Sequence, residues 1–263
     1  VKAHDRAAVL AVLGDVADWI GSGDAVADRA TGERFVSAYQ AKHAITRNAN
    51  GDTAELTIGE NDHPFAFPIV KQGEGWRFDS LAGKEEMLAR RIGENELSAI
   101  TVLQAIADAQ WEYASEDRDG DRNLEYARKV ASSPGKRDGL YWPVKAGEPP
   151  SPLGELLARA AAEGYKRAKS GPTPYHGYYF KLLDGQGKNA ASGAVEYVIR
   201  GRAIGGFAAV AYPAKYGNSG IMTFLINQDG KIFEADLGPQ TRTKASAMKH
   251  FDPGTGWSPV AMR

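Results

Sequence analysis

The stretch KEEMLARRIGENELSAITVLQAIADAQWEYASE, residues 84–116, has the apolar spacing of one long helix. Its apolar side chains recur at three- and four-residue steps, so that one broad face carries Leu88, Ile92, Ile100, Leu103, Ile106 and Tyr113. At about 1.5 Å per residue such a helix reaches about 50 Å. Gly93 costs about 1 kcal/mol inside a helix, and it therefore marks the expected bend at a domain boundary.

The residues before this helix predict a small α+β domain over residues 1–83. RAAVLAVLGDVADWI and GERFVSAYQAKH have helical spacing, whereas HAITRN, TAELTIG, HPFAFPIVKQ and GWRFDS alternate every second residue, as antiparallel strands do. Helices followed by a meander of this length form one α+β unit.

Residues 84–263 predict a second domain, in which the long helix lies on an antiparallel sheet. Two shorter helices are expected at LEYARKVASS and LGELLARAAAEGYKRA, and five strands at YHGYYFKLLD, AVEYVIRG, GGFAAVAYP, GIMTFLINQD and KIFEADLG. Asp229-Gly230 is the strongest hairpin signal, because a type I′ turn needs positive φ at both central residues. The predicted fold class is α+β in two domains.

Composition excludes several classes of function. Lys and Arg number 32 against 33 Asp and Glu, a net charge of -1, so that no overall field favours nucleic acid or an anionic membrane. The chain has no cysteine, which excludes disulfides, thiolate metal sites and cysteine nucleophiles. No apolar run has the roughly 18 to 20 residues of a membrane helix. The chain begins at Val1 in a segment already helical in pattern, which leaves room for an upstream export signal.

Four stretches together carry a family resemblance: GWRFDSLAGKEEMLARRIGENELSAI, SPGKRDGLYWP, PYHGYYFKLLDGQG and GGFAAVAYPAKYGNSGIMTFLINQDGKIFEADLGP. They closely resemble a bacterial family catalogued as domain of unknown function 2950, over nearly the whole chain. Members of that family usually carry an export signal, so the resemblance implies a periplasmic or secreted protein. It brings no activity and no catalytic residues.

A second likeness lies within the C-terminal part. NELSAITVLQAIADAQWEYAS, the acidic loop after it, GYYF and GIMTFLINQDGKIFEAD resemble the globular domains of type IV pilins and pseudopilins. Those domains place a helix spine against an antiparallel sheet, which implies a pilin-like fold for residues 84–263, with the first domain in place of the assembly segment. The N-terminal pattern is similar to the cone-shaped fold of nuclear transport factor two and ketosteroid isomerase relatives, by fold analogy alone.

The acidic segment SEDRDGDRNLEYA, residues 115–127, is the candidate metal site. Oxygen ligands at alternate positions around a glycine suit calcium. The ligands would be Asp117, Asp119, Asp121, Asn123 and Glu125. The segment is not an EF-hand, because Arg122 and Arg128 stand where that loop needs Gly and Glu. The alternative is a solvated turn in which Asp121 or Asn123 caps a following helix.

Three further motifs each have a functional and a structural interpretation. His176 could act as a general base oriented by Glu196, or it could pack locally at the start of a strand. Ser219 stands between small residues, as some nucleophiles do, but a strand follows it, which favours a turn. Gly205-Gly206 favours a bulge over a phosphate loop. The histidines without zinc-ligand spacing are His4, His43, His63 and His250.

Two functions are compatible with these patterns. The first is a non-catalytic structural or interaction module of the bacterial envelope, whose partner would be another envelope protein or a surface assembly. The second is an enzyme or small-ligand binder that uses a concave N-terminal sheet. Its apolar pocket would be lined by Trp19, His63, Phe65, Phe67, Trp76 and Phe78. The same aromatic residues also suit an ordinary core.

Overall fold

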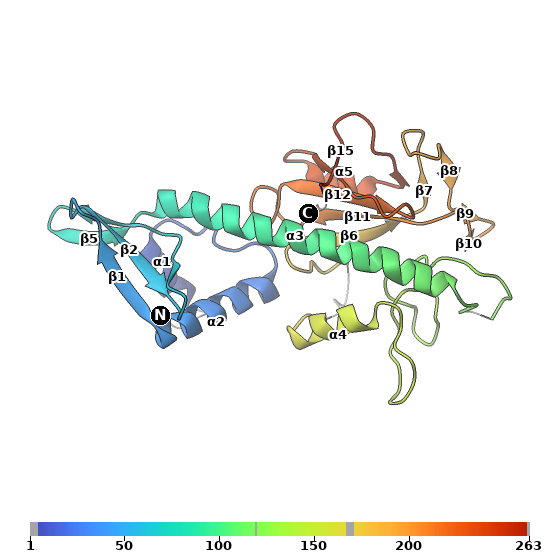
Figure 1. Ribbon diagram of the computed structural model, residues 1–263, viewed down its shortest axis with the longest axis horizontal. Helices are drawn as coiled ribbons and strands as arrows, with labels where there is room; N and C mark the ends of the chain where they lie inside the picture. The colour runs from blue at the N-terminus through green and yellow to red at the C-terminus, as the bar shows by residue number, and fades with distance from the viewer. Residues whose placement is uncertain (1–4, 119, 167–170, 262–263) are drawn as a thin grey trace.

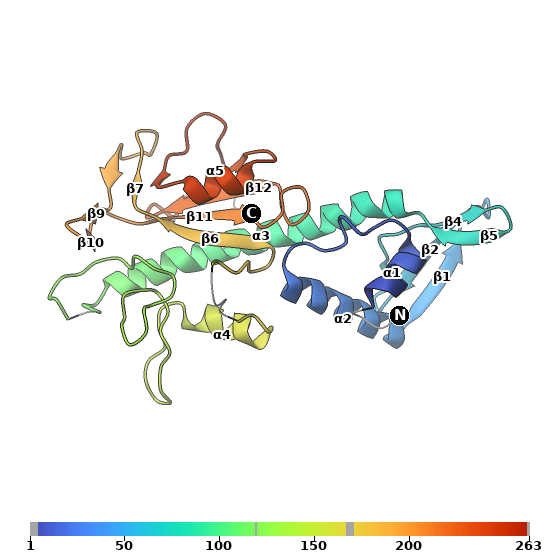
Figure 2. The same cartoon turned by 180° about the vertical axis from the view of Figure 1, so that it is seen from behind.

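The computed structural model describes residues 5–118, 120–166 and 171–261. The molecule is elongated, and one helix, α3 (Ser80–Ala114), runs from an N-terminal half into a C-terminal half (Figures 1 and 2). Helices combined with mainly antiparallel sheets confirm the predicted α+β class. Within the described residues, no helix is both long enough and apolar enough to cross a membrane.

The N-terminal half is a sheet covered by helices. Its sheet has the order β1-β2-β4-β5, with β3 also paired to β2. The elements are α1 (Arg6–Leu13), α2 (Ala25–Ala41), β1 (His43–Arg47), β2 (Thr53–Ile58), β3 (His63–Pro64), β4 (Ile69–Gln72) and β5 (Gly75–Phe78). Helices followed by an antiparallel meander were expected here from the sequence, and the element order agrees.

The long helix α3 begins four residues before the predicted start at Lys84. The Asp79 side chain accepts hydrogen bonds from the backbone N–H groups of Leu81 and Ala82, and this cap sets the first turn. The helix continues through Gly93 without interruption. Its first turns pack in the N-terminal core and its later turns pack on β11 and β12, so one helix contributes to both cores.

Two glycines of α3 give opposite expectations. A Cβ atom at Gly83 would lie 2.4 Å from the Phe67 ring, whereas a Cβ atom at Gly93 would meet nothing within 4 Å. We expect Gly93→Ala to raise the free energy of unfolding by about 0.5 to 1 kcal/mol, because alanine loses less backbone entropy. Gly83→Ala should lower it by about 1 to 3 kcal/mol through overpacking. Urea denaturation measures both, and equal shifts would contradict the packing of Phe67 on α3.

The C-terminal half has three layers: α3, a five-stranded sheet and α5 (Thr241–Ala247) (Figures 1 and 2). The sheet order is β15-β13-β12-β11-β6. The strands are β6 (Tyr178–Leu183), β11 (Ala208–Pro213), β12 (Met222–Asn227), β13 (Phe233–Asp236) and β15 (Ser258–Pro259). The inner strand β11, between β12 and β6, is buried along its whole length. Ala209 and Ala211 join the core under α3, and Val210 and Tyr212 join the core under α5.

Two short pairings complete this half. One small sheet joins β14 (His250–Phe251), β7 (Gly185–Gln186) and β8 (Val195–Glu196), and a hairpin joins β9 (Val198–Ile199) to β10 (Arg202–Ala203). The sequence AVEYVIRG was predicted as one strand of the main sheet, and this is wrong. It is divided between β8 and β9 because Tyr197 turns its ring into the core, where its hydroxyl bonds Gln186 at 2.7 Å.

The segment LEYARKVASS was predicted as a helix, and this is also wrong. Tyr126 forms an isolated bridge with Ala203, and Ala131 forms one with Tyr141. In this extended segment the backbone N–H groups of Tyr126 and Ser132 donate to the carbonyls of Ala203 and Tyr141. A helix would instead pair these groups within the segment. The predicted helix at residues 153–168 is shorter than expected, since α4 spans Gly154–Ala162.

The predicted hairpin between β12 and β13 is confirmed by antiparallel pairing, but its predicted turn type is wrong. Gly230 has φ of 72°, whereas Asp229 is not among the residues of positive φ. A type I′ turn requires positive φ at both positions. The Asn227 side chain instead accepts from the Asp229 N–H at 3.2 Å and the Gly230 N–H bonds the Asn227 carbonyl at 3.0 Å, so the amide of Asn227 organises the turn.

Candidate functional site

A groove of about 420 Å³ lies between α3 and α4. Its apolar residues are Ala105 and Ala109 on α3, and Leu153 and Leu156 at α4. Ala109 and Leu153 are buried and the other two are half-buried, so this apolar set forms the bottom of the groove. Small alanine side chains on α3 leave the space that longer side chains would fill.

The helix periods bring charged residues to the edge of the same groove. Asp108 and Glu112 follow Ala105 by three and seven residues, which places them on one face of α3. Glu155 and Arg159 are likewise one turn apart on α4. All four are exposed and line the groove, so a ligand in it would meet three carboxylates and one guanidinium.

None of the three carboxylates forms an ion pair within the part of the chain that the structure describes. Within residues 5–118, 120–166 and 171–261, no ion pair or side-chain hydrogen bond involves the carboxylates of Asp108, Glu112 or Glu155. The pKa of Tyr175 is raised by burial, with Glu163 raising it further and the nearby Arg159 guanidinium lowering it. Three carboxylates against the one guanidinium of Arg159 leave the groove edge net negative.

A cluster of three polar side chains joins α3, the residue after α4 and the segment before β6. Ser98 Oγ lies 2.9 Å from His176 Nδ1, and His176 Nε2 lies 2.8 Å from a Glu163 carboxylate oxygen. The Tyr175 and His176 rings contact at 4.2 Å between centroids. His176 has φ of 47°, which few non-glycine residues adopt, so its position is imposed by these contacts. Glu163, which sequence reasoning missed, is the acid that orients His176.

The predicted partner of His176 was Glu196, and this is wrong. Glu196 lies in β8, where a carboxylate oxygen is 3.2 Å from His250 Nε2. Glu163 is only thirteen residues before His176 in sequence, but it follows the last turn of α4, whose end was predicted too late. If the end of α4 had been predicted at Ala162, Glu163 would have been recognised as a residue just beyond the helix, where its side chain can meet His176.

Ser98, His176 and Glu163 have the order of a nucleophile, a base and an orienting acid, but their setting does not suit acyl transfer. Ser98 lies inside α3, where backbone N–H groups are already bonded to carbonyls one turn earlier. A serine hydrolase needs free N–H donors beside the nucleophile to stabilise an oxyanion. The cluster is better suited to holding α3, the end of α4 and the start of β6 together.

Asp24 connects the N-terminal half to this cluster. Its carboxylate is buried and accepts four hydrogen bonds. Two come from the N–H groups of Val26 and Ala27 at 3.1 Å, one from the Tyr165 hydroxyl at 2.9 Å and one from the Gly177 N–H at 3.0 Å. Burial raises the pKa of Tyr165 far above its usual value, so its hydroxyl stays a donor. Asp24 thereby caps α2 and also bonds Gly177, which follows His176, and Tyr165, whose hydroxyl accepts from the His176 N–H.

Arg91 makes a second connection from the middle of α3. Its guanidinium donates to the carbonyls of Trp19 at 3.1 Å and Ile20 at 2.7 Å, and to the Asn218 side-chain oxygen at 2.6 Å. Burial lowers the pKa of Arg91. The Asn218 amide also donates to the Trp19 carbonyl at 3.0 Å. The segment before α2, the helix α3 and the loop after β11 are therefore joined through one half-buried guanidinium.

The turn at Tyr216 to Gly220, considered as a nucleophile motif, belongs to this junction. Ser219 is fully buried, and its hydroxyl accepts from the Lys215 N–H at 2.9 Å. The pair Gly205-Gly206 lies against Glu196 and Tyr197, where a side chain at either position would collide. Close packing thus explains these glycines, in keeping with the structural interpretation of both motifs.

The acidic loop forms a network of its own. Asp117 accepts from the N–H groups of Gly120 and Arg122, both at 2.8 Å. Asp121 pairs with Arg202 at 2.6 Å and accepts from the Asn123 N–H at 2.9 Å. No helix follows, so neither Asp121 nor Asn123 is a helix cap as the turn interpretation expected. The described part of the chain contains no group of three or more carboxylates and histidines placed to hold a metal.

Calcium binding by this loop stays a prediction, because Asp119 lies outside the described residues and Glu125 is half-buried nearby. Calcium would have to displace the N–H donors from Asp117 and the guanidinium from Asp121. The turn interpretation, in which these donors are retained, predicts that chelator-treated protein melts at the same temperature with and without millimolar calcium. A rise in melting temperature that Asp117→Ala abolishes would establish a site instead, since a ligand specific to the folded state stabilises it.

The six residues proposed to line an N-terminal pocket fall into two groups. Trp19 and Phe67 are buried and stack at 6.0 Å between centroids, and Phe65 lies 5.1 Å from Phe67 and 5.8 Å from Phe78. The other two are exposed and interact with arginines: Trp76 lies under Arg47 and His63 beside Arg90. The contacts favour the core interpretation of the buried rings.

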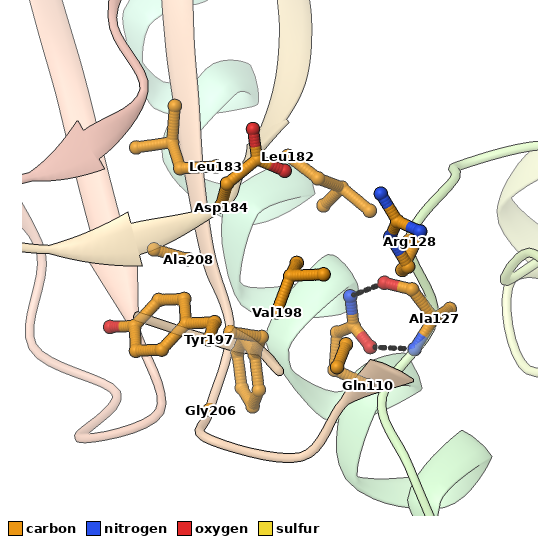
Figure 3. A pocket seen from close by; sticks show the side chains of 12 residues that line it. Gln110, Ala127, Arg128, Leu182, Leu183, Asp184, Tyr197, Val198, Gly206 and Ala208 are labelled. Carbon is orange, nitrogen blue, oxygen red and sulfur yellow. Dashed lines mark hydrogen bonds between the residues drawn. The ribbon is translucent and has the colours of Figure 1, made fainter. Parts of the chain in front are cut away.

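A second cavity lies under the C-terminal sheet and has a volume of about 20 Å³. Figure 3 shows Gln110 at its wall, bonded to the backbone of Ala127 by both ends of its amide, at 2.9 and 2.8 Å. The space suits about one water molecule. It is too small to serve as a ligand site.

The family model described as "Protein of unknown function (DUF2950)" matches residues 1–260. No curated protein matches the chain, and no solved structure does. The likeness to pilins is therefore not confirmed.

Proposed function

Since the chain belongs to the DUF2950 family of proteins of unknown function, we propose a function from its geometry: a non-catalytic interaction module of an exported bacterial protein, which docks a partner in the α3–α4 groove. The partner would be another envelope protein or a surface assembly. Location outside the cytoplasm is part of the proposal and is supported by the export signal usual in relatives.

The observation that supports docking most is the composition of the groove. Its apolar bottom, with Ala109 and Leu153, is edged by the exposed carboxylates of Asp108, Glu112 and Glu155. An apolar centre with a polar edge is the usual anatomy of a protein interface. Its volume of about 420 Å³ falls within the range of about 300 to 1,000 Å³ typical of ligand sites.

The polar clusters elsewhere support the non-catalytic assignment. Ser98 bonds His176 and His176 bonds Glu163 within the C-terminal half, and Asp24 bonds the N-terminal half to Tyr165 and Gly177. The bond between Ser98 on α3 and His176, and the bond between His176 and Glu163 after α4, connect the two helices that border the groove. Preformed sites bind with a smaller loss of conformational entropy.

Site-specific photo-crosslinking in the producing cells tests the proposal. A photoreactive amino acid replaces Ala105 in the groove, and a matched control replaces Leu81, which is 74% exposed on α3 outside the groove. We expect one discrete adduct from position 105, none from position 81, and loss of the adduct when Leu156→Glu places a charge in the groove bottom. Equal adducts from both positions, or none from position 105, would refute docking in the groove.

A further inference from the structure

We propose that the segment docked in the α3–α4 groove is cationic: a short peptide segment of a partner protein that presents Lys or Arg side chains beside apolar ones. This inference rests on the proposed function and deepens it by naming the chemistry of the partner. The docked segment is identified by the charge and shape of the groove.

Charge complementarity gives the sign of the partner. Asp108 and Glu112 stand one turn apart on α3, where two like charges destabilise a helix. Glu155 adds a third carboxylate from α4, so that the groove carries three carboxylates against the one guanidinium of Arg159. A bound cation relieves this repulsion, whereas a carboxylate or phosphate ligand would increase it.

The apolar bottom of the groove favours Lys or Arg side chains over a compact inorganic cation. Lys and Arg carry methylene stems that lie along apolar surface while the charged head reaches polar groups. In this groove the stems would contact Ala105, Ala109 and Leu156, and the heads would reach Asp108 and Glu112. A compact inorganic cation would leave these apolar contacts unused, so a peptide segment fits the groove better.

The size of the groove limits the length of the segment. A volume of about 420 Å³ holds a few side chains of a peptide. Binding of such a short segment depends on its charge pairs with the groove. Salt screens these pairs, because the carboxylates are exposed. Binding should therefore weaken as ionic strength rises.

Fluorescence anisotropy with two labelled hexapeptides tests the inference on the full chain. One probe has the sequence Leu-Lys-Ala-Leu-Lys-Ala, and the other has Glu in place of each Lys. We expect saturable binding of the Lys peptide and a dissociation constant at least about tenfold weaker for the Glu peptide, because like charges would then meet at the groove.

Two triple variants with the same change in net charge locate the binding. D108N/E112Q/E155Q neutralises the groove edge, and E74Q/E85Q/E94Q neutralises exposed carboxylates elsewhere. We expect the first to weaken Lys-peptide binding about tenfold and the second to leave it within about twofold. Equal weakening by both would mean non-specific attraction, and no weakening by the first would mean another site. Either result overturns the inference.

A charge swap guards against loss of fold in the neutralised variant. E112K/E155K should bind the Glu peptide in preference to the Lys peptide, and circular dichroism should match the parent chain. No saturable binding of the Lys peptide at millimolar concentration would also overturn the inference. If crosslinks from position 105 persist in that case, docking holds and only the cationic class fails; if they are absent too, the proposed function itself fails.

Discussion

Asp24→Ala is expected to lower the free energy of unfolding by about 3 to 5 kcal/mol, the largest effect among the substitutions considered. The carboxylate of Asp24 caps α2 through Val26 and Ala27, and removal of such a cap costs about 0.5 to 2 kcal/mol. Its loss also leaves the buried Gly177 N–H and the Tyr165 hydroxyl without this acceptor. Unsatisfied buried donors cost about 1 to 3 kcal/mol each.

Urea denaturation followed by circular dichroism measures this effect through the transition midpoint. Asp15→Ala is the matched control, because Asp15 is an exposed aspartate nine residues earlier, and its change should stay within about 0.5 kcal/mol. Tyr165→Phe should cost less than Asp24→Ala and should add little to it, since both remove the same hydrogen bond. A cost below about 1 kcal/mol for Asp24→Ala would show that the junction does not depend on this carboxylate.

Arg91→Ala is expected to cost about 2 to 4 kcal/mol. The guanidinium bonds the carbonyls of Trp19 and Ile20 and the side chain of Asn218, and hydrogen bonds to charged groups contribute about 1.5 to 3 kcal/mol each. Removing the guanidinium leaves the carbonyls of Trp19 and Ile20 and the Asn218 side-chain oxygen without this donor. Because these bonds join the two halves, the variant should also unfold with a lower m-value or in two steps.

Arg29→Ala is the control for Arg91→Ala, because Arg29 is exposed on α2. Its effect should stay within about 0.5 kcal/mol. A single transition with the parent m-value and a cost below about 1 kcal/mol for Arg91→Ala would contradict the junction described here. The predicted division into domains 1–83 and 84–263 stays a prediction, and limited proteolysis near residues 80–95 tests it.

Much of the fold could be predicted from local patterns. The apolar period of residues 84–116 predicts α3 within four residues at its start and two at its end. The alternation on both sides of Asp229-Gly230 predicts the β12–β13 hairpin. The period of α3 is visible because its apolar residues recur at helical spacing, and the hairpin is visible because Asp229-Gly230 divides two strand-like segments.

The failures have a common physical cause, which is contact with distant residues. The residues around Tyr126 have a helical pattern, but Tyr126 forms a bridge with Ala203, which is distant in sequence. Tyr197 divides a predicted strand because its hydroxyl finds Gln186. Non-local contacts override local propensity, and single-sequence patterns do not contain them.

The residues of the site show the same limit. The position of Asp24 before α2 identifies it as a helix cap, but nothing in the sequence indicates its hydrogen bonds to Tyr165 and Gly177. Arg91 and Glu163 resemble ordinary surface charges in sequence. The alanines and carboxylates of the groove follow the helix period, yet only the placement of α4 brings Glu155 opposite Asp108.

Docking in the α3–α4 groove is tested most directly by hydrogen–deuterium exchange of the full chain, alone and with the Lys-bearing hexapeptide. The short helix α4, Gly154–Ala162, should exchange quickly alone and more slowly with the peptide, together with residues 104–112 of α3. Residues of β1 (His43–Arg47), an exposed strand in the other half, should not change. Protection of β1 or of the β9–β10 hairpin without protection of α4 would contradict the account.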